Sequence, residues 1–194
     1  ITLLDSYRKI IEAILNKRLN KILRDYHMLK GLNYGFKRGA GTSDAITIIR
    51  HLIDIAKDDK KKLLMAILDV QAAYDTVPMS AVESGLKRIK APQQFIDLLK
   101  SMESNRAQCF LTPFGPTQQL RSTRGLPQGG ILSPTLWNIF YDPLLCTLQQ
   151  ETQGYTIPSG KKGTPGNVRI TSISFADDLH PFSQSNSDMN HQLH

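Results

Sequence analysis

The chain has 194 residues, 40% of them apolar, which is enough to bury the core of one ordinary globular domain. Two cysteines, Cys109 and Cys146, exclude a disulfide framework and a four-cysteine zinc site, and no signal peptide or membrane-spanning apolar run is seen. We therefore expect an intracellular protein, in the nucleus or the cytoplasm, with no membrane partner. Because the chain begins with Ile1 and ends in a polar stretch, we expect a fragment of a longer protein.

The formal net charge of +7 lies entirely in the first third of the chain. Residues 1–65 hold 14 Lys and Arg against 7 Asp and Glu, whereas the remainder holds 10 of each kind. A basic segment attracts phosphate-rich partners through the release of counterions. A solvated helix surface explains such a segment equally well at this point.

Helical and loop patterns alternate in the first third. Apolar residues recur with helical spacing over residues 6–29, which predicts an amphipathic helix. A glycine-rich loop follows at 31–43, and Thr42 or Ser43 is placed to cap a second helix that runs to about Ala56. The apolar run LLMAILDV at 63–70 is expected to be a central strand covered on both faces.

The rest of the chain mixes helices with hairpins. Helices are predicted at 79–90 and 92–104, and a hairpin is predicted around PFGP at 113–116. Ser133 before Pro134 indicates a capped helix that is disturbed at Pro143. The runs VRITSISF at 168–175 and LHPFS at 179–183 predict a second hairpin, which Pro181 could distort by removing a ladder donor.

Three aspartates end two of the predicted strands. Asp69 follows the strand at 63–68, and Asp177 and Asp178 follow SISF. If the two strands pair, three carboxylates converge and a cation must relieve their repulsion. Oxygen ligands without nearby His or Cys favour Mg²⁺, with Mn²⁺ as a substitute, and two such ions catalyse in-line phosphoryl displacement. Taken alone, an Asp pair at a turn is usually turn chemistry.

Taken in order, these segments resemble the reverse transcriptases, most closely those of non-LTR (LINE-type) retrotransposons. The three palm motifs are matched by AILDVQAAYDTV (66–77), RGLPQGGILSPTLWNIFYDPLL (124–145) and SFADDL (174–179). Two finger motifs are similar to ITLLDSYRKIIEAILNKRL (1–19) and GFKRGAGTSDAI (35–46).

The resemblance implies an α+β right-hand polymerase fold in which an antiparallel palm sheet packs on helices. Residues 1–183 would form a fragment of the reverse transcriptase domain, with 1–65 resembling fingers and 66–183 forming the palm with interleaved fingers elements. We expect 184–194 to be a polar, disordered tail and the thumb to be absent.

The family's metal site falls on residues at the ends of the two strands. Asp69 and Asp177 match its metal-binding, catalytic aspartates, with Asp178 beside them and the Val70 carbonyl as a further oxygen ligand. The resemblance implies two Mg²⁺ ions at these positions.

Other family roles fall on residues that also have simpler explanations. Tyr74 matches a steric gate that collides with a ribose 2′-hydroxyl, although it could be a core aromatic. Gln128 and Gly129 in LPQGG are expected to contact the nucleotide. Lys9 occupies a basic position that contacts the triphosphate, although helix lysines are often merely solvated.

A further set of residues is expected to contact the template. It consists of Phe36, Lys37 and Arg38, a mix of aromatic and basic side chains in one loop. Phe36 could instead belong to the core.

The implied function is that of an RNA-directed DNA polymerase, a nucleotidyltransferase that binds an RNA template, a DNA primer and dNTPs. Three alternatives remain open. They are a catalytically idle nucleic-acid-binding remnant, favoured by Pro181 and the missing thumb, a group II intron reverse transcriptase and an RNA-dependent RNA polymerase. The sequence indicates no protein partner.

Overall fold

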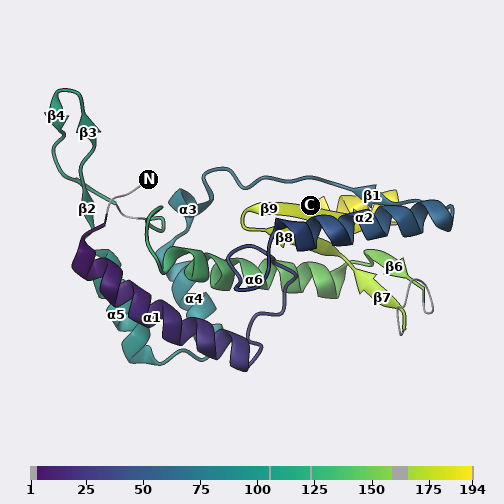
Figure 1. Ribbon diagram of the computed structural model, residues 1–194, viewed down its shortest axis with the longest axis horizontal. Helices are drawn as coiled ribbons and strands as arrows, with labels where there is room; N and C mark the ends of the chain where they lie inside the picture. The colour runs from purple at the N-terminus through teal and green to yellow at the C-terminus, as the bar shows by residue number, and fades with distance from the viewer. Residues whose placement is uncertain (1–3, 105, 123, 159–165, 194) are drawn as a thin grey trace. The chain divides into compact units, whose positions relative to one another are not determined.

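The computed structural model describes residues 4–104, 106–122, 124–158 and 166–193, in which helices alternate with short strands (Figure 1). The elements are, in chain order, α1 (Ser6–Asp25), α2 (Thr42–Asp58), β1 (Leu64–Met65), α3 (Ala73–Thr76), α4 (Met79–Arg88), α5 (Gln93–Ser104), β2 (Ala107–Gln108), β3 (Leu111–Thr112), β4 (Gly115–Pro116), β5 (Leu120–Arg121), α6 (Ser133–Glu151), β6 (Tyr155–Ile157), β7 (Val168–Ile170), β8 (Ser172–Phe175), β9 (Asp178–Ser183) and α7 (Asn186–Leu193).

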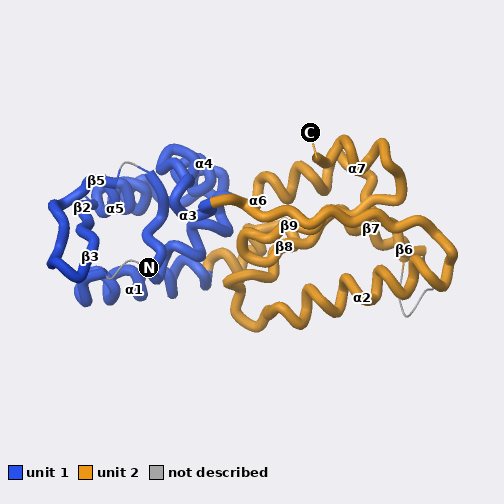
Figure 2. The backbone as a smooth tube through the Cα atoms, turned by 90° about the horizontal axis from the view of Figure 1, so that it is seen from above, with its two compact units in different colours: residues 1–21, 72–140 blue, residues 22–71, 141–194 orange. Residues whose placement is uncertain are grey.

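The chain divides into two compact units, and each is described by itself (Figure 2). Unit 1 comprises residues 1–21 and 72–140, and unit 2 comprises residues 22–71 and 141–194. The divisions after Lys21 and Phe140 fall inside α1 and α6. The expected division into fingers and palm segments between residues 65 and 66 stays a prediction.

Helices α4 and α5 and the first part of α6 build the interior of unit 1. Val82, Leu86 and Ile96 are buried together with Ile139 of α6. Gly85 permits this packing, because a Cβ atom there would lie 3.0 Å from the Ile139 carbonyl oxygen. The two helices predicted at 79–90 and 92–104 are confirmed, as is the hairpin around PFGP, in which β2 pairs with β5 and β3 with β4.

A three-stranded antiparallel sheet in the order β1-β9-β8 lies at the centre of unit 2. Helix α2 runs beside β8 (Figure 1), and Leu52 and Ile55 of this helix share a core with Ile173 and Phe182 of the sheet. Burial of each such side chain contributes roughly 1.5–3 kcal/mol to folding. The core fixes one face of the hairpin against α2.

Strand β1 lies at the edge of the sheet, so the prediction of a central strand covered on both faces was wrong. Regular pairing is limited to Leu64–Met65, with one further bridge between Leu68 and Leu179. Burial alternates along the segment, and Ile67 on the outer face is 70% exposed. A continuous apolar run does not show whether both faces are covered.

Pro181 leaves the β8–β9 hairpin intact, because the backbone position at which it lacks an N–H group faces β1 and not β8. The carbonyl of Pro181 accepts a hydrogen bond from Ala66 N–H at 3.2 Å, so its backbone polar groups point toward β1. The adjacent Phe182 N–H points the other way and donates to Thr171 at 2.7 Å. Pro181 pairs with Ser172 in the regular register, so the expected distortion is not seen.

Residues Asn186–Leu193 form helix α7, so the expectation of a disordered tail was wrong for this segment. Met189 is buried, and Asp188 accepts hydrogen bonds from the backbone of Gln153 and Gly154 at 2.8 and 3.0 Å. One apolar anchor and one carboxylate thus dock a helix that is otherwise polar. His194 lies outside the described residues.

The residues predicted to cap α2 and α6 have other positions or contacts. Helix α2 is capped at Gly41, whose N–H donates to the Asp44 carboxylate at 2.7 Å, rather than by Thr42 or Ser43. Ser133 is the first residue of α6, and its hydroxyl donates to the Pro127 carbonyl. None of the helices in the described ranges is long and apolar enough to cross a membrane.

Candidate active site

The Asp177–Asp178 pair lies at the turn of the β8–β9 hairpin in unit 2. Phe175 and Asp178 form the last pair of the ladder, so Ala176 and Asp177 make a two-residue connection. Ala176 has a φ of 58°, in the left-handed region. An alanine in this region costs about 1–2 kcal/mol, which the surrounding contacts must offset. The turn leaves Asp177 half-buried and Asp178 exposed.

Asp69 reaches the same end of the sheet from the neighbouring strand segment. Leu68 and Leu179 exchange two backbone hydrogen bonds, both with an N···O distance of 2.9 Å. Continued by one residue, this antiparallel register puts Asp69 opposite Asp178. The strand that carries Asp69 pairs with β9 and not with the SISF strand β8, so the expected pairing was wrong in its partner. Because β9 begins at Asp178, the three aspartates still share one end of the sheet.

The donors at this end of the sheet suit a hard divalent cation. Asp69, Asp177 and Asp178 offer only carboxylate oxygens, and Val70 adds a backbone carbonyl, which are ligands typical of Mg²⁺ and Mn²⁺. In the described ranges, no three His, Cys, Asp or Glu side chains are arranged so that they could hold a metal ion. The assignment of these residues as metal ligands stays a prediction.

Tyr141 of α6 lies within the electrostatic reach of the two turn aspartates. The side chain is 4% exposed. Burial, followed by the negative charges of Asp177 and Asp178, raises the pKa of Tyr141 to about 12. Nothing in the sequence pointed to Tyr141, because a tyrosine inside an apolar helix gives no signal of its electrostatic surroundings.

The loop at 31–38 lies along β8 and ends beside the aspartate turn. Ser174 N–H donates to the Leu32 carbonyl, and the Ser174 carbonyl accepts from Tyr34 N–H, both at 2.9 Å. Gly35 meets the turn itself, because a Cβ atom there would lie 2.2 Å from the Ala176 amide nitrogen. Only glycine permits so close an approach of two backbones.

The three residues expected to contact the template follow Gly35 directly. Phe36 is 47% exposed and Arg38 is exposed, whereas Lys37 is half-buried. Burial lowers the pKa of Lys37, although the charge of Asp142 opposes this effect, and its Nζ lies 3.4 Å from the Gly31 carbonyl oxygen. Lys37 therefore supports the loop from inside, and the template contacts stay a prediction.

In unit 1, hydrogen bonds bring Tyr74 and Gln128 together. Leu126 N–H donates to the Tyr74 carbonyl at 2.7 Å, and Gln128 Nε2 donates to the Asp75 carboxylate at 2.9 Å. The ring of Tyr74 meets Trp137 edge-on, with centroids 5.8 Å apart. Asp75 thus holds the Gln128 side chain, and the Tyr74 ring has core contacts in addition to its candidate role.

A buried ion-pair network supports the glycine turn at 125–130. Glu12 of α1 is 2% exposed and accepts hydrogen bonds from Arg8 Nε at 2.8 Å and from Leu132 N–H at 3.3 Å. Arg8 also pairs with Glu103 of α5. A Cβ atom at Gly130 would lie 3.2 Å from the Glu12 carboxylate, so this carboxylate packs directly on the turn. The sequence analysis missed this role of Glu12.

Two further nucleotide-binding candidates lie near this network in the chain. Gly129 is exposed in the turn beside Gln128. Lys9 is half-buried on α1 and follows Arg8, but it is not among the groups that form the ion-pair network. The contacts that join Tyr74 to Gln128 do not involve Lys9 either, and its role stays a prediction.

The chain is similar to proteins of mobile genetic elements. The family described as "Reverse transcriptase (RNA-dependent DNA polymerase)" matches residues 1–194. The chain is 29% identical over 180 residues to the "Retrovirus-related Pol polyprotein from type-1 retrotransposable element R2" of Popillia japonica, covering 92% of this chain and 24% of that protein. It is 30% identical over 149 residues to the "Probable RNA-directed DNA polymerase from transposon BS" of Drosophila melanogaster, covering 75% and 16%.

Solved telomerase structures share the fold. The alignment with apo telomerase from Candida tropicalis, truncated from the C-terminal domain, covers 97% of this chain and 36% of the telomerase chain, with a TM-score of 0.63 and 14% identity. Telomerase from Candida albicans with a TWJ fragment of telomeric RNA aligns with 93% and 31%, with a TM-score of 0.62 and 12% identity. The expected α+β right-hand polymerase fold is confirmed.

Proposed function

The chain belongs to the reverse transcriptase family, and we propose that it provides the catalytic centre of an RNA-directed DNA polymerase from a retrotransposable element. Its similarity to proteins of non-LTR elements, such as R2, supports this proposal. The observation that carries it is the register of the sheet, which brings Asp69 beside the Asp177–Asp178 turn. The chain spans 24% of the R2 relative, so the activity belongs to the protein that contains this segment.

In the proposed reaction, the 3′-hydroxyl of a DNA primer attacks the α-phosphate of a dNTP, and pyrophosphate leaves. Asp69 and Asp177 would hold two Mg²⁺ ions, with Asp178 and the Val70 carbonyl as further oxygen donors. Bound there, the metal ions supply activation of the attacking hydroxyl and stabilisation of the charge that develops on the phosphoryl group. Because the like charges of these carboxylates repel one another at one end of the sheet, binding of a cation between them is favourable.

The groups of unit 1 handle the incoming nucleotide in this proposal. Tyr74 lies under the sugar and excludes a ribose 2′-hydroxyl, which selects dNTPs. The hydrogen bond that Gln128 donates to the Asp75 carboxylate orients the Gln128 amide, and Gly129 lets the nucleotide approach the backbone. Lys9 contacts the triphosphate.

The loop beside the aspartate turn receives the RNA template. Phe36 stacks on a base and Arg38 meets the phosphate backbone, while Lys37 holds the loop in place. This reaction would take place inside the cell, in the nucleus or the cytoplasm.

The test is primer extension on an RNA template with Mg²⁺, using a longer protein that contains this chain. Asp177→Asn should lower the rate by at least about 10²-fold, the scale on which loss of one charge-stabilising group affects catalysis. Asp97→Asn is the matched control, because Asp97 is an exposed aspartate of α5 that accepts a hydrogen bond from Gln93. Retained activity of Asp177→Asn would contradict the proposal, and an inactive wild type would favour an idle nucleic-acid-binding remnant.

A further inference from the structure

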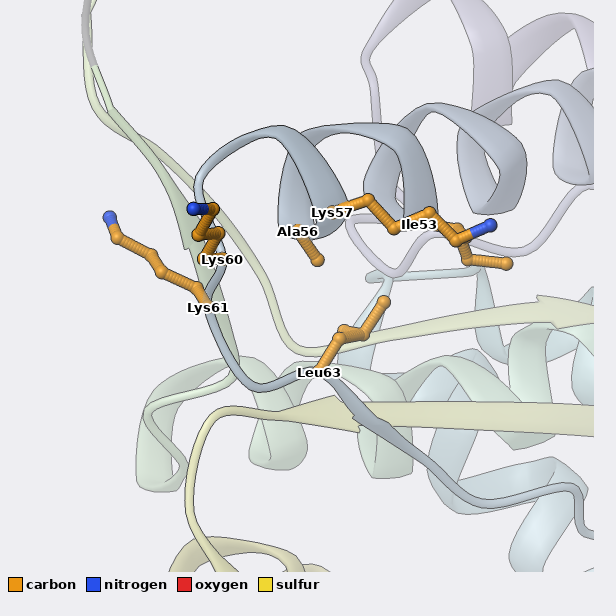
Figure 3. A pocket seen from close by; sticks show the side chains of 6 residues that line it. All are labelled: Ile53, Ala56, Lys57, Lys60, Lys61 and Leu63. Carbon is orange, nitrogen blue, oxygen red and sulfur yellow. The ribbon is translucent and has the colours of Figure 1, made fainter.

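A basic pocket of about 380 Å³ opens where α2 ends, away from the residues assigned above (Figure 3). Its apolar floor comes from Ile53 and Ala56 of α2 and from Leu63, which precedes β1. Figure 3 shows Leu63 reaching toward the helix, with three lysines around the pocket, namely Lys57, Lys60 and Lys61.

The end of the helix places these three lysines. Lys60 has a φ of 53°, and its N–H donates to the Lys57 carbonyl at 3.1 Å. Lys61 N–H donates to the Ala56 carbonyl at 2.9 Å, so the chain folds back over the last turn of α2. The partial negative charge of a helix C-terminus favours cations nearby and accounts for part of this arrangement.

The lysines are only partly neutralised. Lys61 Nζ lies 3.8 Å from the Asp59 carboxylate, a long ion pair between an exposed lysine and an aspartate side chain that is 9% exposed. Within the part of the chain that the structure describes, Lys57 and Lys60 form no ion pair with a carboxylate. Their mutual repulsion would be relieved by an anionic ligand that also has an apolar part to cover the floor.

This pocket is separate from the aspartate turn within unit 2. Leu63 precedes β1, whereas Asp69 follows Leu68 at the other end of the same extended segment. Six extended residues span roughly 20 Å. A ligand in the pocket therefore leaves the carboxylates accessible.

We propose that this pocket binds single-stranded nucleic acid outside the active site. Phosphates contact the three ammonium groups, and the base or sugar of one nucleotide covers Ile53, Ala56 and Leu63. The pocket volume lies at the lower end of the range for small-ligand sites, which suits one nucleotide. Because lysines read the phosphate backbone and not the bases, this binding has no sequence specificity. The choice of nucleic acid over other anions rests on the proposed function.

The experiment measures the affinity of the chain for a single-stranded RNA of about 20 nucleotides by fluorescence anisotropy over a salt titration. The triple variant Lys57→Gln/Lys60→Gln/Lys61→Gln should bind about 10-fold more weakly at roughly 0.1 M salt, and its salt slope should fall by about 2. The control Lys87→Gln/Lys90→Gln/Lys100→Gln removes the same charge from exposed lysines of unit 1 and should change affinity less than about 2-fold. Arginine at all three pocket positions should preserve binding.

Equal losses in the two triple variants would overturn the proposal, because they would reflect net charge alone. If anionic vesicles or polyglutamate displace RNA from the wild type but not from the triple Lys→Gln variant, the pocket lysines form an anion site that binds RNA, which supports the proposal. An RNA affinity that is the same in the wild type and the triple variant would overturn it. Primer extension on the same RNA separates the two proposals. If the wild type binds RNA through the pocket but does not extend a primer, only the proposed polymerase function is contradicted. If it extends a primer but its RNA affinity does not depend on the pocket lysines, only the pocket inference is contradicted.

Discussion

Single backbone positions, more than side-chain contacts, create the candidate active site. Asp69 and Asp178 face each other because Leu68 and Leu179 fix the register, and Asp177 is placed by the left-handed Ala176. A shift by one residue would turn each side chain to the other face of the sheet. The site therefore depends on the pairing of two strand segments that are distant from each other in sequence.

Tyr74 is predicted to control sugar selection. Tyr74→Ala should increase the use of rNTPs relative to dNTPs by about 10-fold or more, because the ring that would collide with the 2′-hydroxyl is gone. Tyr74→Phe keeps the ring and should keep the discrimination. Competition between the two nucleotide types in primer extension measures the ratio, and an unchanged ratio in Tyr74→Ala would restrict Tyr74 to its packing against Trp137.

Tyr141 should make the protein lose stability at high pH. Its pKa is raised to about 12 by burial and by the charges of Asp177 and Asp178. The associated stabilisation is fully present below the ordinary tyrosine pKa of about 10 and is lost as pH rises through the raised value. Urea denaturation between pH 9 and pH 12 should show a shallower decline in the unfolding free energy for Tyr141→Phe. If the unfolding free energies of the wild type and of Tyr141→Phe declined equally with pH, the raised pKa of Tyr141 would be contradicted.

At the scale of elements, the glycine-rich loop and the aspartate hairpin act as one piece. Asp142, buried in α6, accepts hydrogen bonds from Lys30 and Gly31 N–H at 2.8 Å each, which fixes the start of the loop. Gly35 fixes its other end against Ala176. The loop thus constrains the turn that carries Asp177.

Gly35→Ala is expected to disturb this contact. The new methyl group would lie 2.2 Å from the Ala176 nitrogen, so the loop or the turn must shift. Overpacking of this kind costs about 1–3 kcal/mol, and polymerase activity should fall with it. Gly166→Ala is the matched control, since a Cβ there meets no atom of the described residues within 4 Å and such surface changes shift stability by only a few tenths of a kcal/mol. Equal unfolding midpoints for the two variants would count against the contact.

Glu12→Gln should destabilise unit 1. Removing the buried charge leaves Arg8 paired only with Glu103 and weakens the bond to Leu132, at a cost of roughly 3 kcal/mol. Glu83→Gln removes an exposed charge that pairs with Lys87 and Lys100 and should leave the midpoint close to wild type. Chemical denaturation distinguishes the variants, and similar midpoints would show that the Glu12 network adds little.

For the whole molecule, the candidate residues divide between the two units. The aspartates and the loop at 36–38 belong to unit 2, whereas Tyr74, Gln128, Gly129 and Lys9 belong to unit 1. The chain crosses from one unit to the other after Gln71, between Asp69 and Tyr74.

The sequence was informative where a local pattern determines the structure. Helical spacing predicted α1, α4 and α5, and the chain position of the aspartates placed them at strand ends, although the Asp69 strand pairs with β9 and not with the expected SISF strand. The edge position of β1, the harmless orientation of Pro181 and the docking of α7 by Met189 depend on which neighbour each strand or helix meets. No local pattern encodes these long-range contacts. For the same reason, Tyr141 and Glu12 emerged only from the structure.

The most direct test of the central claim is a double-mutant comparison of single-nucleotide incorporation on an RNA template with Mg²⁺. If Asp69 and Asp177 serve one metal centre, Asp69→Asn and Asp177→Asn should each lose at least about 10²-fold in rate. The double variant should then lose about as much as either single variant, because the two residues act as a unit. A wild-type rate in either single variant, or losses that multiply in the double variant, would contradict a shared catalytic centre at this end of the sheet.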